Sequence, residues 1–239
     1  MSKLKPILFN TSMVQAILEG RKTTTRRIVK TDLSLLDYDV NDKDYLYLPD
    51  EYGEFHHLLE YSPYKIGDIL YVRETWCRGK VEIEDTTDGF QGETYISQCI
   101  GDEDIIFKQQ AIQEGIDISE TKWKPSIFMP KEATRIFLKV TNVKVERLQD
   151  ITEEGARQEG ADHTQKYYFP FRVKHDEKHK KCLYDKPFEY GDYRTTFAQI
   201  WDDTLNKNDK LAWMYEFKNN PYVWVIEFER ISKEEALNG

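Results

Sequence analysis

The stretch ILFNTSMVQAILEGRKTTTRR (Ile7–Arg27) predicts a strand, a short helix and a basic loop in succession. Leu4–Phe9 has the apolar character of a short strand. Asn10 or Thr11 can cap the helix that follows, and Gly20 stands where the glycine after a helix end belongs. One face of this helix would carry the apolar residues Met13, Val14, Ile17 and Leu18.

The basic loop, Gly20–Arg27, interleaves three threonines with four cations. In an extended conformation Thr23, Thr25 and Arg27 share one face, and Lys22 lies at the helix exit, from which it can turn towards them. Guanidinium and ammonium groups bind planar oxygen pairs and small anions. The segment therefore predicts a ligand site, with a solvated surface turn as the alternative.

The distribution of charge favours a small ligand over a long polymer. The 239-residue chain has a net charge of −9, which disfavours long duplex nucleic acid. Residues 20–30 carry a net +5, whereas residues 31–60 carry a net −8. No run of 18 apolar residues predicts a membrane span. Three widely spaced cysteines and an N-terminus without a secretory signal predict a cytoplasmic protein.

Further along the chain, strands are expected to outnumber helices. The strands are predicted at 67–76, 135–145 and 222–228, and a shorter one at 94–100. Helices are predicted after Asp150, as N-cap of a capping box with Glu153 and a stop at Gly160, and over 193–205. No β-α-β rhythm is present, so an α+β fold is expected, a mixed or antiparallel barrel with short flanking helices.

A second group of polar residues interrupts the strand pattern at Arg73-Glu74-Thr75-Trp76. Arg73 or Glu74 can bind the edge of a base, and Trp76 can stack on its face. The alternative is an internal Arg–Glu pair at the rim of the barrel. Further candidates for ligand contacts follow in the proline-bracketed segment 123–130: Trp123, Lys124 and Ser126.

A metal site has weaker support in the sequence. His175 and His179 have helical i, i+4 spacing and Cys182 follows them, but a structural zinc site needs four ligands. The surrounding residues are those of a charged loop, so no metal is predicted. No glycine-rich phosphate loop occurs, and no cofactor is predicted.

The residues Gly20, Lys22 and Arg27 resemble the signature of the ASCH family, in which an arginine stands five positions after the lysine. The resemblance extends in order through GDILYVRETW (67–76), WKPSIFMPKEATRIFLKV (123–140), ARQEG (156–160) and NPYVWVIEF (220–228). It covers about half the chain and is greatest to the larger ASCH proteins of phages and prophages. It implies a single PUA-like β-barrel domain over 1–239 with insertions at about 31–64, 77–120 and 161–192.

The resemblance also implies residue roles. A small relative is an amidohydrolase acting on N4-acetylcytidine, and its lysine, threonine and glutamate match Lys22, Thr25 and Glu159. Neutral Lys22 would remove the Thr25 hydroxyl proton, Thr25 would attack the acyl carbonyl, and Glu159 would orient the lysine or the cytosine amine. Thr23, Arg26 and Arg27 would contact the ligand.

The first expectation is an ASCH protein that binds a modified nucleoside, a nucleotide or RNA in a polar cleft. Three alternatives remain open at this point. They are an amidohydrolase of N4-acetylcytidine-type nucleosides, a ribonuclease, and a non-catalytic phage interaction protein whose acidic insertions form the functional surface. The sequence leaves both catalysis and the oligomeric state open.

Overall fold

The computed structural model describes residues 4–30, 36–38, 46–83, 94–97, 104–162, 192–205 and 209–238. The chain divides into two compact units, each built from segments that are far apart in the sequence. Unit 1 comprises Met1–Thr23, Leu59–Lys144 and Ile226–Gly239, and unit 2 comprises Thr24–Leu58 and Val145–Val225.

A five-stranded sheet contains the strands that the sequence analysis placed most firmly. In hydrogen-bonded order its strands are β1 (Leu4–Leu8), β6 (Ile69–Arg73), β10 (Phe137–Arg147), β11 (Tyr222–Ile231) and β2 (Thr24–Ile28). The sheet is mixed, because β1 runs parallel to β6 and β10 runs antiparallel to it. The expected α+β class is therefore confirmed, although the described residues show no closed barrel.

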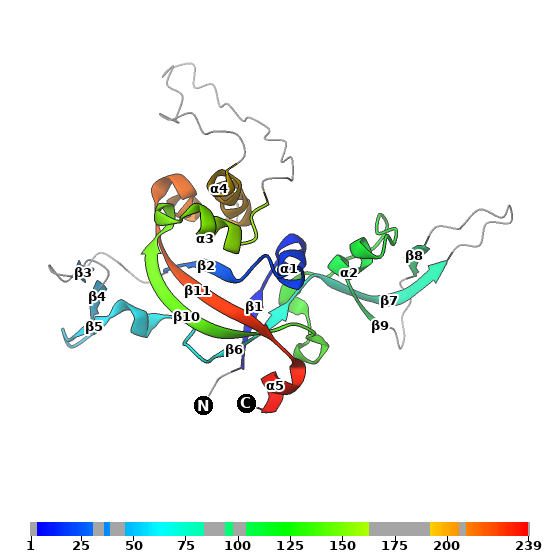
Figure 1. The fold of residues 1–239 in the computed structure, drawn as a ribbon, viewed down its shortest axis with the longest axis horizontal. Helices are drawn as coiled ribbons and strands as arrows, with labels where there is room; N and C mark the ends of the chain where they lie inside the picture. Colours follow the sequence, from blue (N-terminus) through cyan, green and yellow to red (C-terminus); the bar gives the residue numbers. More distant parts are fainter. Residues whose placement is uncertain are drawn as a thin grey trace, which may run out of the picture. The chain divides into compact units, whose positions relative to one another are not determined.

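In unit 1, β1 leads directly into helix α1 (Thr11–Leu18), as expected (Figure 1). Asn10 caps the helix by accepting the Met13 N–H at 2.9 Å, and Val14, Ala16 and Ile17 are buried. Gly20 takes a φ of +73°, which a glycine adopts without strain, and the chain turns out of the helix there. In the parallel pairing of β1 with β6, Ile7 lies opposite Val72, and both side chains are buried.

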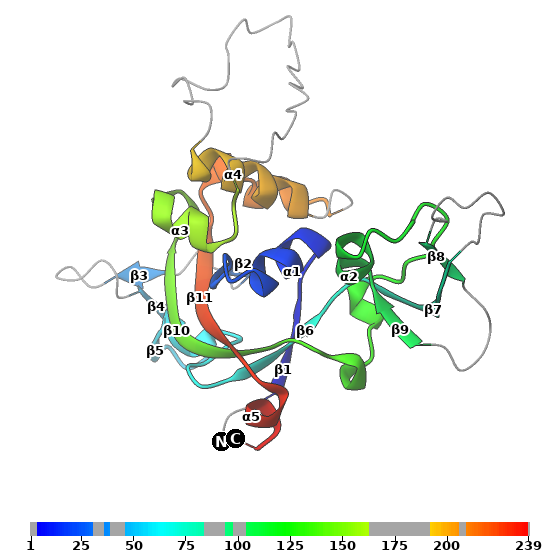
Figure 2. The ribbon, with the colours of Figure 1, turned by 45° about the vertical axis from the view of Figure 1, so that its right-hand side comes forward.

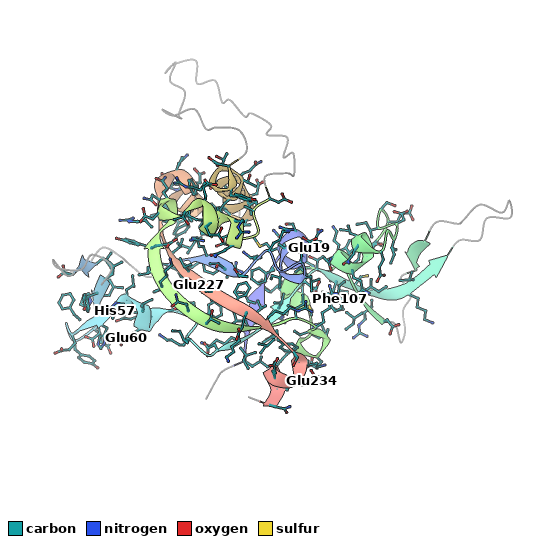
Figure 3. All side chains as sticks on the ribbon, in the orientation of Figure 1. Glu19, His57, Glu60, Phe107, Glu227 and Glu234 are labelled. Carbon is teal, nitrogen blue, oxygen red and sulfur yellow. The ribbon has the colours of Figure 1, made fainter. Side chains whose placement is uncertain are left out.

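Unit 1 also holds a second, smaller sheet in the predicted insertion at 77–120. Its strand order is β8 (Thr94–Ser97), β7 (Trp76–Ile83), β9 (Asp104–Phe107), and β9 continues into helix α2 (Lys108–Gln113) (Figure 2). Phe107 stands at the end of β9, next to α2 (Figure 3). Two 3₁₀ turns, Ser126–Phe128 and Lys131–Ala133, precede β10, and helix α5 (Lys233–Asn238) follows β11.

Unit 2 has its core between two helices and the ends of the long strands. Helix α3 (Glu153–Gln158) lies beside helix α4 (Tyr193–Thr204) in both ribbon views. Phe197 and Trp201 of α4 pack with Ala156 of α3 in one buried cluster. The apolar side predicted for 193–205 is therefore the face that packs against the core. The remaining short turns of this unit are Leu148–Asp150, Ala212–Tyr215 and Phe217–Asn219.

The acidic segment 31–64, expected to lie outside the core, contains regular structure. It forms the sheet β3 (Asp37–Tyr38), β4 (Leu46–Pro49) and β5 (Phe55–His57), followed by a 3₁₀ turn at Leu58–Tyr61. Alternation along β4 buries Leu46 and Leu48, the period-2 pattern of a half-buried strand. The many charged neighbours obscured this four-residue pattern in the sequence.

The predicted cap of α3 was wrong by two residues. Leu148–Asp150 is a separate 3₁₀ turn, and Ile151 has ψ 128°, so the chain leaves the helical region before α3 begins. Thr152 is the N-cap, and its hydroxyl accepts the Gly155 N–H at 3.0 Å. Gly160, with φ +86°, follows the C-cap Glu159 as expected. The third predicted insertion, 161–192, lies almost entirely outside the described residues.

Asn10 offers a test of how α1 is held. Changing Asn10→Ala removes the side-chain acceptor that caps this helix, and we expect the free energy of unfolding to fall by about 1 kcal/mol in urea titrations. Asn10→Asp keeps an acceptor in the same place and should stay within a few tenths of a kcal/mol of the wild type. Equal losses in both variants would contradict the capping role.

Candidate functional site

Lys22 has the largest fully buried side chain in the described part of the chain, at 2% exposure. Its backbone is fixed by α1, because the N–H groups of Arg21 and Lys22 both donate to the Ala16 carbonyl at 2.9 and 3.0 Å. Its Nζ lies 5.6 Å from the centroid of the Phe9 ring. Lysine is almost never fully buried in proteins, so this position requires favourable contacts to hold the amine.

Glu74, at 1% exposure, is buried as deeply in the same unit. Arg135 holds it with a two-pronged contact, Nε to Oε1 and Nη2 to Oε2, both at 2.9 Å. The Arg135 guanidinium also donates to Gln109 Oε1 at 3.1 Å and stands 4.4 Å from the Phe107 ring centroid. Glu74 is therefore half of an internal Arg–Glu pair, but its partner is Arg135 and not Arg73.

Phe9 connects these two buried charges. The Lys22 amine lies over the Phe9 ring. The Phe9 backbone N–H donates to the carbonyl of Arg73, the residue before Glu74, at 3.2 Å. Arg73 itself turns elsewhere, since its Nε donates to the Met129 carbonyl at 2.9 Å. The contacts of Phe9 thus link Lys22 to the end of β6, directly before Glu74.

Trp76 and Lys124, two separate candidates for ligand contacts in the sequence, lie side by side. Their backbones form an antiparallel bridge, with N–H to carbonyl distances of 3.2 and 2.7 Å. The Lys124 Nζ stands 4.9 Å from the centroid of the Trp76 ring. Trp123 packs against a buried apolar cluster that contains Cys77 of β7 and Ile106 of β9. Ser126 is the first residue of the 3₁₀ turn Ser126–Phe128.

In unit 2, β2 carries the threonine and arginine part of the motif. Thr25 and Arg26 are both buried, and Arg27 is half-buried. Arg26 binds two carboxylates. Its Nε and Nη2 lie 2.9 and 2.6 Å from Glu146 Oε1, and its Nη1 lies 3.2 Å from Glu159 Oε1. Its guanidinium also stands 5.8 Å from the Phe197 ring centroid.

Gly155 leaves room for this arrangement. A Cβ at that position would lie 3.3 Å from Arg26 Nη2 and 3.2 Å from the Thr152 hydroxyl. Successive side chains of a strand point to opposite faces, so Thr25 and Arg26 diverge, and it is Arg26 that reaches Glu159. Arg26, predicted to contact a ligand, instead connects β2 to β10 and the end of α3.

The predicted trio of Lys22, Thr25 and Glu159 is divided between the units, with Lys22 in unit 1 and the other two in unit 2. Their convergence stays a prediction. Sequence reasoning missed Phe9, Arg135 and Glu146 as members of these clusters. Arg135 gave one signal, a charge directly before an alternating apolar run, whereas Phe9 and Glu146 looked like ordinary strand residues.

The residues that the structure describes hold neither a cluster of metal-ligating side chains nor a membrane-spanning helix. No group of three or more His, Cys, Asp or Glu side chains gathers there as a metal site. The residues His175, His179 and Cys182 lie outside the described ranges. None of the helices in the described ranges combines the length and apolarity needed to cross a bilayer.

Comparison with known proteins gives no family for the chain: no protein-family model, curated protein or solved structure matches it.

Arg26 and Arg157 form a matched pair for testing the buried ion cluster of unit 2. Arg26→Met leaves Glu159 and Glu146 without their common cation, and we expect a loss of about 3–5 kcal/mol in unfolding free energy. Arg157 pairs with Glu154 at 2.7 Å on the surface, with both side chains more than half exposed, so Arg157→Met should leave the unfolding free energy almost unchanged. Similar losses in urea titrations would show that the Arg26 cluster contributes no more than a surface pair.

Proposed function

We propose that the chain is an ASCH-type domain of PUA-like architecture that binds a nucleobase-containing ligand at the cluster of Lys22, Glu74 and Phe9. The observation that carries this proposal is the burial of Lys22, at 2% exposure, beside an aromatic ring in a unit that also buries Glu74. Burying a charged amine is costly. Amines at such positions are candidates for contacts with a ligand.

The chemistry of the cluster matches a base better than a simple anion. A nucleobase offers carbonyl and ring-nitrogen acceptors to a lysine, amine donors to a carboxylate, and a flat face to aromatic rings. Arg135 fixes the plane of the Glu74 carboxylate through both of its oxygens, so a donor on the ligand would meet an acceptor of defined direction. In this arrangement the Lys22 amine would donate to an acceptor of the base, Glu74 would select bases that carry a donor, and the Phe9 ring would contact the face of the base.

Binding without catalysis is favoured over the amidohydrolase by the contacts of Glu159. The hydrolase would use this carboxylate to orient Lys22 or the substrate amine, and here its Oε1 also accepts from Arg26 Nη1 at 3.2 Å, a structural contact that the hydrolase does not require. Thr25 also diverges from Arg26 along β2. The hydrolase remains the second candidate, because a threonine three residues after a buried lysine is the arrangement its nucleophile requires.

A panel of nucleosides and nucleotides, including cytidine and N4-acetylcytidine, tests the proposal by calorimetric titration. Lys22→Met keeps the length of the side chain and removes its charge, so we expect the Kd of the best ligand to rise about 10- to 150-fold. Thr25→Val removes one hydroxyl and should raise the Kd no more than about fivefold. Lys233→Met, at an exposed lysine of α5, serves as the matched control and should leave the Kd unchanged.

Turnover separates the two candidates in the same samples. A binding domain leaves N4-acetylcytidine intact, as judged by chromatography after prolonged incubation. Hydrolysis by the wild type that both Lys22→Met and Thr25→Val abolish would establish the amidohydrolase instead. Absence of binding to every member of the panel would refute the proposal as a whole.

A further inference from the structure

In unit 2, β4 and β5 form a hairpin (Figure 1), and this hairpin presents two aromatic side chains to solvent. Tyr52, in the turn between the two strands, is 83% exposed, and Phe55, the first residue of β5, is 57% exposed. Residues 46–57 contain three acidic residues and no lysine or arginine. Two of the acidic residues, Glu51 and Glu54, are exposed on either side of Tyr52 along the chain. We call residues 46–57 the acidic hairpin.

The turn of the acidic hairpin is fixed by contacts of Asp50. Its Oδ1 accepts the N–H groups of Tyr52 and Glu54 at 2.8 and 2.9 Å, and its own N–H donates to the Glu54 carbonyl at 2.8 Å. The Glu54 N–H is the largest of the causes that lower the pKa of the Asp50 carboxyl, so Asp50 is negatively charged at neutral pH. A partner that binds Tyr52 would therefore order little additional backbone, which keeps the entropic cost of association low.

A second exposed apolar pair lies in unit 1, and its charged neighbours are basic. In the first of the two 3₁₀ turns that precede β10, Ile127 is 55% exposed and Phe128 is 68% exposed. Residues 121–131 contain three lysines and no acidic residue, in a chain whose net charge is −9. All three lysines are exposed. We call residues 121–131 the lysine–apolar turn.

Met129 holds the lysine–apolar turn in place. Its side chain is fully buried in an apolar cluster, and its carbonyl accepts the Arg73 Nε at 2.9 Å. The Phe128 N–H donates to the Pro125 carbonyl at 3.0 Å and closes the turn. Phe128 thus stands on a fixed backbone, yet its exposed ring adds little buried area to the fold. Like Tyr52, it is an aromatic side chain that is accessible to a partner.

The two surfaces are complementary in charge and similar in apolar character. Each has exposed aromatic residues, Tyr52 and Phe55 on the hairpin and Phe128 on the turn, with charged side chains of one sign around them. In protein interfaces, aromatic residues contribute much of the binding energy, and charged groups at the rim select the partner. Two hairpins, or two turns, would bring like charges together, which disfavours association between identical surfaces. Charge therefore favours the pairing of a hairpin with a turn.

We propose that copies of this chain associate through the acidic hairpin of one copy and the lysine–apolar turn of another. Because one chain carries both surfaces, each copy supplies a partner for the next. The aromatic side chains of the hairpin pack against Ile127 and Phe128, and Glu51 and Glu54 face the lysines around them. An interface between unlike surfaces continues from copy to copy until a ring closes, or it extends into a filament. The inference does not depend on the ligand site at Lys22.

Sedimentation velocity of the full chain measures this association, at protein concentrations from about 1 µM to about 1 mM, the Kd range of weak complexes. In about 0.1 M NaCl we expect the mean sedimentation coefficient to rise with concentration. In about 1 M NaCl the screening length falls from about 10 Å to about 3 Å, and we expect the Kd to rise about fivefold or more. A chain that stays monomeric over the whole range in low salt would overturn the proposal.

Charge reversal assigns the association to the two surfaces. Glu51→Lys with Glu54→Lys makes the hairpin basic, and Lys124→Glu with Lys131→Glu makes the turn acidic. Each double variant alone should associate about tenfold more weakly than the wild type, or worse, because its two surfaces then have the same sign. In an equimolar mixture each surface of one variant meets an opposite surface of the other, so the Kd should return to within about threefold of the wild type. Two variants with the near-ultraviolet circular dichroism of the wild type whose mixture stays dissociated would contradict the proposal.

A matched control reverses two exposed lysines of unit 1 outside the turn. Lys80→Glu with Lys233→Glu changes the net charge as much as Lys124→Glu with Lys131→Glu and should leave the Kd within about threefold of the wild type. Equal losses in these two variants would show that net charge alone governs association, and the assignment to the turn would be wrong.

The aromatic side chains test the contact independently of charge. Tyr52→Ser and Phe128→Ser each remove an exposed ring where folding is not at risk, and each should raise the Kd about fivefold or more. Unchanged association of both variants would refute the apolar contact. A wild-type chain that stays monomeric but binds a peptide of alternating lysine and phenylalanine, and loses this binding with Glu51→Lys and Glu54→Lys, would identify a different basic protein as the partner and overturn self-association.

Discussion

The burial of four of the five polar residues from Lys22 to Arg26 is the constraint on which the rest of the structure depends. Lys22, Thr24, Thr25 and Arg26 are all less than 9% exposed, although the segment connects a helix to a strand and would ordinarily lie at the surface. Buried charges must be matched by partners that the fold provides. Unit 1 provides the Phe9 ring for Lys22, and unit 2 provides Glu146 and Glu159 for Arg26.

These partners serve different purposes. The Arg26 cluster has two carboxylates for one guanidinium and joins β2, β10 and the end of α3, so it is a structural connection that fixes the second half of the motif. Lys22 lies over the Phe9 ring, and Arg135, the partner of Glu74, lies over the Phe107 ring. Arg135 neutralises Glu74 and fixes its plane. In the proposed function, Lys22 is the cation that contacts the ligand.

Much of the fold could be predicted from the sequence because its signals are local. The cap at Asn10, the turn at Gly20 and the strong periodicity of 222–228 each depend on a few neighbouring residues, and the structure has the expected elements there. The pairing of Arg135 with Glu74, across 61 positions, leaves no local signal, and neither does the contact between Arg26 and Glu146. Arg73 and Arg26 were predicted to contact a ligand, but each donates hydrogen bonds to acceptors within the protein.

A crystal structure of the chain with a bound cytidine nucleotide tests the central claim most directly, because it places the ligand relative to the two buried charges. The account predicts the base beside Phe9, with an acceptor of the ligand within hydrogen-bond distance of Lys22 Nζ and a donor facing the Glu74 carboxylate. A nucleotide bound away from Lys22, with the Lys22 and Glu74 contacts unchanged from those of the free protein, would contradict it.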